Sequence, residues 1–121
     1  MPLPSTEMKQ CIDLCHECHD ACVQTAQNCL EKGGRYVDAA SVRLLLDCAQ
    51  ICHTSEDFLL RDSDLHSLTC SVCAEVCARC ADECLRLADD VLKHCAEVCR
   101  RCAASCQQMA GTWTLAGAGV R

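Results

Sequence analysis

The chain has 121 residues, a net charge of −6, and acidic and basic side chains mixed along its length. This length fits a single domain, and the absence of a basic patch argues against nucleic-acid binding, as do the few aromatic residues. No apolar run approaches the roughly 20 residues that cross a bilayer, so we expect no membrane interaction. The aromatic residues are Tyr36, Phe58 and Trp113.

Sixteen of the residues are cysteine. In a short secreted chain such a content indicates a disulfide scaffold. Residues 1–10, however, contain neither the apolar segment nor the twin arginine that direct export. We therefore expect a cytoplasmic protein, whose thiols stay reduced.

The first predicted helix runs from Ser5 to Lys32, with Pro4 and Ser5 as start signals and Gly33-Gly34 as the stop. At about 100° per residue, its five cysteines fall within an arc of roughly 60°. Cysteine thus occupies the positions where an ordinary helical bundle carries leucine. These cysteines are Cys11, Cys15, Cys18, Cys22 and Cys29.

The second predicted helix runs from about Arg35 to Arg61 and has only two cysteines. The first half of its inner face offers ordinary apolar residues to the core. The predicted face consists of Val37, Ser41, Leu44, Cys48, Ile51, Cys52, Ser55 and Leu59.

The third and fourth predicted helices repeat the cysteine spacing of 4, 3 and 4 residues that also opens the first helix. Asp62-Ser63-Asp64 supplies the N-cap of the third helix, to about Ala88, and Asp89-Asp90 that of the fourth, to about Ala110. The cysteines span arcs of roughly 80° on the third helix and 60° on the fourth. They are Cys70, Cys73, Cys77, Cys80 and Cys84, followed by Cys95, Cys99, Cys102 and Cys106.

Four helices joined by short turns predict an all-α fold, an antiparallel up-down-up-down four-helix bundle with a cysteine-lined core. We assign residues 1–110 to this bundle and residues 111–121, which contain three glycines, to a C-terminal tail. Folding the chain at its turns places Cys48 and Cys52 level with the middle cysteines of the first and third helices. The cysteines are therefore expected to form one continuous inner column.

The spacing of three or four residues between successive cysteines predicts metal binding by many thiolates. Residues three or four apart on a helix have Cβ atoms about 5–6 Å apart, close enough for two sulfurs to bind one ion. A disulfide needs Cβ atoms about 3.8 Å apart, so pairing within a helix would distort it. Soft thiolates select Cu(I), zinc or iron–sulfur clusters.

Charge favours Cu(I) among these metals. Each Cu⁺ that replaces a thiol proton leaves the site neutral, whereas Zn²⁺ bound by four thiolates leaves two negative charges in the core. Buried charge without compensation is costly, and no lysine or arginine points clearly inward. We therefore predict multiple Cu(I) ions, up to about one per cysteine.

The other candidate ligands are histidines and methionines. Met8, His66 and Met109 project toward the inner face at the end of the bundle that holds both termini, where they would form a mouth. His16 and His53 fall about 140° from the cysteine faces and are expected on the surface. His19 and His94 lie at the flanks.

The repeated Cys-x3-Cys-x2-Cys-x3-Cys helices, the two-cysteine second helix and the histidine and methionine at the mouth resemble the bacterial copper storage proteins, in particular their cytosolic branch. The resemblance covers roughly Met8 to Met109. It implies a homotetramer of four-helix bundles that holds Cu(I) mainly between thiolate pairs in the cytoplasm, with all sixteen cysteines as ligands. It adds His66 and Met109 to that ligand set. The apolar first half of the second helix departs from the pattern. It lies at the end of the bundle that holds the Gly33-Gly34 turn, called the glycine-turn end below.

Two other functions remain open from the sequence. One is a thiol redox enzyme or sensor, which would need exposed cysteines of depressed pKa. The other is a zinc or cadmium buffer of the metallothionein type. Copper-donor or copper-acceptor proteins are possible partners of a storage protein.

Overall fold

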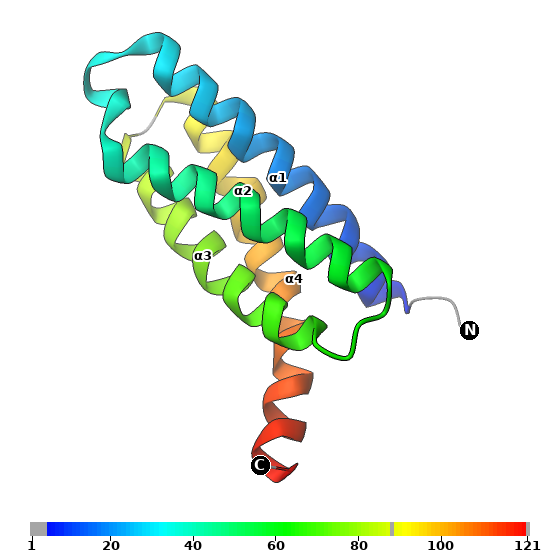
Figure 1. Ribbon diagram of the computed structural model, residues 1–121. Helices are drawn as coiled ribbons and strands as arrows, with labels where there is room; N and C mark the ends of the chain where they lie inside the picture. Colours follow the sequence, from blue (N-terminus) through cyan, green and yellow to red (C-terminus); the bar gives the residue numbers. More distant parts are fainter. Residues whose placement is uncertain (1–4, 88, 121) are drawn as a thin grey trace.

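The computed structural model describes residues 5–87 and 89–120, and of residues 112–120 only the backbone. Figure 1 shows four long helices packed side by side, in which α1 and α3 each contact both α2 and α4. This confirms the predicted antiparallel four-helix bundle. In chain order the elements are α1 (Thr6–Lys32), the 3-10 turn η1 (Gly34–Val37), α2 (Ala39–Leu60), α3 (His66–Leu87) and α4 (Asp90–Val120).

Side-chain caps fix the helix ends that the sequence predicts well. Ser5 Oγ accepts a hydrogen bond from the Met8 N–H at 3.1 Å and so caps α1. The Asp89 carboxylate accepts one from the Leu92 N–H at 2.8 Å and begins α4 in the same way. Such caps satisfy N–H groups that have no partner within the first helical turn.

The start of α2 differs from its prediction. Gly34–Val37 form a 3-10 turn, and Asp38 caps α2 by accepting a hydrogen bond from the Ser41 N–H at 3.1 Å. Val37 therefore precedes the α-helix, and its side chain is 41% exposed instead of lying on the inner face. Leu45 is buried at the position expected for Leu44, which is only partly buried.

The end of α4 also differs. The sequence predicts an end near Ala110, but the helix continues to Val120. Figure 1 shows its last turns, in red, projecting beyond the end of the bundle that holds the N-terminus. The glycines of this segment suggested a stop, yet each glycine costs a helix only about 1 kcal/mol. The division into a bundle and a tail stays a prediction, since the side chains of residues 112–121 lie outside the described part.

The core is built from small residues. Every cysteine side chain is at most 1% exposed, and alanines fill positions beside the cysteines. Leucine reaches the core mainly at the glycine-turn end, through Leu45, Leu87 and Leu92. Within the described residues, each helix falls short of the length or apolarity needed to cross a membrane.

Gly33 offers a test of the turn that orients α2. Its backbone has φ 68° and ψ −159°, a region open almost only to glycine, so Gly33→Ala should lower the free energy of unfolding by about 1–3 kcal/mol. Gly111→Ala is the matched control, because Gly111 lies within α4 with open space around its Cβ position. The control should raise stability by about 0.5–1 kcal/mol. Urea denaturation of the reduced, metal-free protein measures both, and equal effects of the two changes would contradict the assigned turn.

Candidate metal centre

The cysteine sulfurs of all four helices meet along the axis of the bundle. All sixteen cysteines are free thiols, and all are buried. Close sulfur–sulfur contacts include those between Cys11 and Cys106, at 3.6 Å, and between Cys18 and Cys77, at 4.0 Å. A disulfide bond is about 2.05 Å long, so the column consists of thiols in van der Waals contact.

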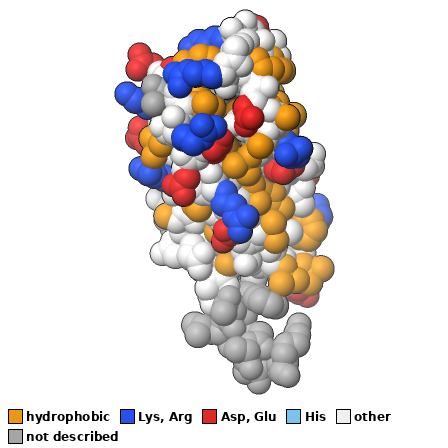
Figure 2. All heavy atoms as spheres, turned by 90° about the vertical axis from the view of Figure 1, so that its left-hand side faces the viewer, with side chains coloured by type: hydrophobic (Ala, Val, Ile, Leu, Met, Phe, Trp, Pro, Cys, Tyr) orange, Lys and Arg blue, Asp and Glu red, His pale blue; other side chains and the backbone are white. Residues whose placement is uncertain are grey.

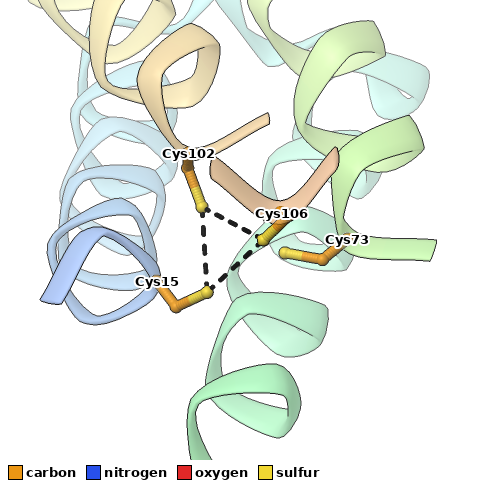
Figure 3. Close-up of side chains that lie close together, drawn as sticks. All are labelled: Cys15, Cys73, Cys102 and Cys106. Carbon is orange, nitrogen blue, oxygen red and sulfur yellow. Dashed lines mark hydrogen bonds between the residues drawn. The ribbon is translucent and has the colours of Figure 1, made fainter. Parts of the chain in front are cut away.

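At the end that holds the N-terminus, the sulfurs of Cys11, Cys70 and Cys106 lie within 4.8 Å of one another. Cys106 also belongs to the next group inward, with Cys15, Cys73 and Cys102 (Figure 3). In that group Cys106 lies 3.7 Å from Cys15 and 4.0 Å from Cys102. Three helices therefore contribute to each of these two groups, and the shared sulfur links one group to the next.

The middle of the column is held together by the two cysteines of α2. Cys52 lies 3.7 Å from Cys73 and 3.6 Å from Cys77, and Cys48 lies 3.6 Å from Cys77 and 3.9 Å from Cys18. The predicted axial level of Cys48 and Cys52 is thus confirmed. Two four-sulfur groups share Cys52 and Cys77. They are Cys52, Cys73, Cys77 and Cys102, and Cys18, Cys48, Cys52 and Cys77.

The column thins toward the glycine turn. A last four-sulfur group joins Cys18, Cys22, Cys48 and Cys99, so that twelve of the sixteen cysteines belong to groups of three or four. Within the described residues, the remainder lie in no such group, although Cys95 contacts Cys22 at 3.9 Å. Leucines of the core occupy this end of the bundle. The remaining cysteines are Cys29, Cys80, Cys84 and Cys95.

These separations suit metal ions without movement of the helices. A zinc–thiolate bond is about 2.3 Å long, which places sulfurs about 4.0 Å apart around a three-coordinate ion and about 3.8 Å apart around a four-coordinate one. The closest contacts, such as 3.6 Å between Cys11 and Cys106, lie near both values, and the sulfurs of each group all lie within 4.8 Å of one another. The thiols are therefore arranged for metal binding before any metal arrives.

The electrostatics of the column come from the thiols themselves. Burial, followed by the Asp89 carboxylate, raises the pKa of Cys29. Contacts with neighbouring thiols, led by Cys18, raise the pKa of Cys22 but lower that of Cys48, whose thiolate would accept S–H hydrogen bonds. The groups therefore share protons, and a bound cation would displace them.

The charged side chains lie outside this core. The buried polar residues of the described chain are Thr25, Ser41, Ser55 and Ser67, none of which carries a charge. No buried cation is therefore available among them to compensate a net negative metal–thiolate site.

Met8, His66 and Met109 lie one helical turn outward from Cys11, Cys70 and Cys106, respectively, on three different helices. All three are partly buried, and both methionines pack against the core. His66 Nδ1 lies 2.9 Å from the Ser63 carbonyl oxygen. Because a carbonyl only accepts, Nδ1 must donate there, which leaves the Nε2 lone pair free to bind a metal.

The sequence places Ser55 on the inner face of α2 but does not indicate a role for it. Its hydroxyl lies 3.4 Å from the Cys70 sulfur, and its side chain is fully buried. Ser55 follows Cys48 and Cys52 with the same 4 and 3 spacing that the cysteine-rich helices use. This spacing indicates that Ser55 lies in line with the cysteines, where its hydroxyl can contact the outermost thiol group of Cys11, Cys70 and Cys106.

Comparison with solved structures shows the same bundle in other proteins. The protein Nmul_A1745 from Nitrosospira multiformis is 41% identical, with a TM-score of 0.83 over 88% of this chain and 96% of that one. The Cu(I)-bound copper storage protein BsCsp3 of Bacillus subtilis is 31% identical, with a TM-score of 0.82 over 87% and 99%. A cytosolic copper storage protein from Streptomyces lividans, carrying five coppers, is 32% identical, with a TM-score of 0.78 over 87% and 92%.

Sequence comparison gives a shorter match and a longer one. The uncharacterised cysteine-rich protein YhjQ of Bacillus subtilis (strain 168) is 33% identical over 66 residues, which is 54% of this chain. The match spans 61% of that relative's length, less than two thirds. The sequence model of the copper storage proteins, in contrast, matches residues 4–111, almost the whole bundle. The chain therefore belongs to the copper storage protein family.

Proposed function

We propose that this protein stores and sequesters multiple Cu(I) ions in the cytoplasm. The observation that carries the proposal is the continuous column of buried thiols, in which twelve sulfurs already form overlapping groups of three and four. Copper is the cargo of this column, bound by thiolates that lose their protons as the ions enter. Structural relatives described as Cu(I)-bound and as cytosolic copper storage proteins support the same assignment.

The uncharged core favours Cu(I) over zinc. Several four-sulfur groups have separations that a tetrahedral zinc ion could also accept. Four thiolates around Zn²⁺ would nevertheless leave two negative charges, and the described core holds no cation to offset them. Even where two groups share two sulfurs, six thiolates around two Zn²⁺ ions would leave two uncompensated negative charges, whereas one Cu⁺ per displaced proton keeps the column neutral.

The burial of the thiols argues against redox catalysis or sensing. A reactive cysteine must be accessible to its substrate or oxidant, but every cysteine here is at most 1% exposed. We therefore assign the protein a storage role without enzymatic activity. Exchange with copper-donor or copper-acceptor proteins would take place at the end of the bundle that holds Met8, His66 and Met109.

The proposed ligands are all sixteen cysteines, joined by His66 and Met109 at the mouth. The position of His66 one turn outward from Cys70, with Nε2 free, supports a role as the first ligand that an incoming ion meets. Met109 lies one turn outward from Cys106 and offers a soft thioether, which suits Cu(I). Together with Met8 they would form the entrance to the column.

Titration of the reduced protein with Cu(I) under anaerobic conditions, in competition with a chromophoric chelator, tests this function. We expect tight uptake on the order of ten ions per chain, up to about one per thiol, with proton release as ions bind. Saturation after one or two ions would rule out storage, as would preferential retention of zinc. His66→Ala and Met109→Ala should slow loading and lower the capacity by about one ion at most.

The position of a cysteine in the column should determine its effect on copper binding. Cys52 belongs to two of the four-sulfur groups, whereas Cys29 belongs to none of the groups found in the described residues. Cys52→Ala should therefore lower the copper capacity by more ions than Cys29→Ala does. Both side chains are fully buried, so the two variants control for the packing defect that any truncation causes. Equal losses of copper would contradict the grouping.

Assembly into a homotetramer is part of the proposal. Exposed apolar side chains of α1 and α2, among them Val23, Leu30 and Leu46, line two adjoining surface hollows. Figure 2 shows a further band of hydrophobic side chains on the face at the left of Figure 1, where α2 and α3 lie. Such surfaces are suited to burial between copies of the chain. Light scattering should give a mass four times the 13.2 kDa of one chain, and a monomeric mass would exclude the assembly.

A further inference from the structure

A second set of metal-binding side chains lies outside the thiol column, on the outer surface where α1 packs against α2. Its members are exposed or partly exposed, and the sequence places two of its histidines well away from the cysteine faces. The set consists of His16, His19 and Asp20 from α1, and His53, Glu56 and Asp57 from α2.

Two contacts cross between the helices. His16 Nδ1 lies 3.3 Å from a carboxylate oxygen of Glu56. One turn further along, the rings of His19 and His53 have centroids 5.4 Å apart at an interplanar angle of 44°. From His16 to His19 the chain advances three residues along α1, and from Glu56 to His53 it goes back three residues along α2. Both contacts therefore belong to the same antiparallel alignment of the two helices. The side chains thus form a single patch, which we call the seam cluster.

Contacts within each helix complete the seam cluster. Asp20 lies 3.0 Å from His19 Nδ1 and 3.6 Å from His16 Nε2. On α2, Asp57 lies 3.5 Å from His53 Nε2. Every imidazole therefore has a carboxylate beside it, an arrangement that orients histidine ligands in metal sites.

The negative charge of the seam cluster favours binding of a cation. Its three carboxylates carry a formal charge of −3, and among the described residues no lysine or arginine lies within ion-pair distance of them. Elsewhere on the surface, Glu83 and Glu17 are paired with Arg86 and Arg101. Glu56 is the least exposed of these carboxylates, since its side chain is only 15% exposed, and its ion pair within the described residues is with His16.

We propose that the seam cluster binds a divalent ion of the zinc and nickel class, with His19 and His53 as ligands from the two helices and neighbouring carboxylates completing the site. Imidazole and carboxylate suit such borderline ions, whereas soft Cu(I) prefers the thiols. The donor atoms now lie in pairs 3.0 to 3.6 Å apart. No three of these donor atoms lie as close together as the sulfurs of each thiol group do, so the exposed side chains must rotate to direct their donors at one ion.

The ion would join α1 to α2 from outside the bundle. His19 and His53 directly follow Cys18 and Cys52 in the sequence, and these cysteines share a four-sulfur group in the column. A bound ion therefore ties together two of the three helices that hold this group, and it stabilises the fold by mass action. The site does not depend on whether the column holds copper.

Ni²⁺ is a suitable probe, because a paramagnetic ion broadens the NMR signals of nearby amides. Ni²⁺ is added to the reduced, untagged, metal-free protein under anaerobic conditions, and amide spectra are recorded. We expect saturable broadening centred on residues 16–20 and 53–57, together with a rise in melting temperature. Binding in the column would also broaden the amides beside Cys77 on α3 and Cys99 on α4, so unchanged signals there distinguish binding at the seam from binding in the column.

The double variant His19→Ala/His53→Ala should weaken this binding by about tenfold or more, as loss of metal-ligand residues generally does. His94→Ala is the matched control, because His94 is an exposed histidine on α4, and it should bind like the parent protein. The proposal fails if the seam amides stay unchanged up to about 1 mM Ni²⁺, the level of a weak site, or if the double variant binds equally well. Neither outcome bears on Cu(I) storage by the thiols.

Discussion

Close contact between thiols from four helices is the constraint on which the rest of the structure depends. A protonated thiol is small and weakly polar, so cysteine can fill a core as a hydrophobic residue does. The same sulfur, once deprotonated, is a soft metal ligand. Contacts of 3.6 to 4.0 Å serve both states, because they match van der Waals packing and also the separation of sulfurs around one ion. The bundle can therefore be folded before it is loaded.

This dual use explains the composition of the helices. A core of leucines would hold the helix axes further apart and would leave no ligands, whereas cysteine with alanine beside it allows close approach. The charged residues are confined to the outside, where they form ion pairs such as Arg79–Glu75 within α3. A core that admits only neutral thiols selects an ion whose charge equals that of the proton it replaces.

The sequence was sufficient to predict the bundle and the burial of every cysteine, because spacings of three and four residues define one face of a helix. It was insufficient where local chemistry competes with periodicity. Asp38 and the 3-10 turn set the start of α2, and glycines within α4 did not end that helix. The grouping of sulfurs also escaped prediction, since it depends on the relative rotation of the helices. Leu45 fits the 4 and 3 spacing of the other buried positions of α2, and Leu44 packs partly buried beside it.

The two ends of the thiol column differ, and this difference indicates at which end copper would enter the proposed store. At the glycine-turn end, Leu45, Leu87 and Leu92 are at most 3% exposed and offer no ligand atoms. At the opposite end, thiols of the outermost group are followed outward by a histidine and methionines, so an incoming ion meets neutral imidazole and thioether ligands before it reaches the thiols. An ion that binds there meets stronger thiolate groups in the interior and a leucine barrier beyond them. Copper would therefore enter and leave through the same end, from which α4 projects in Figure 1.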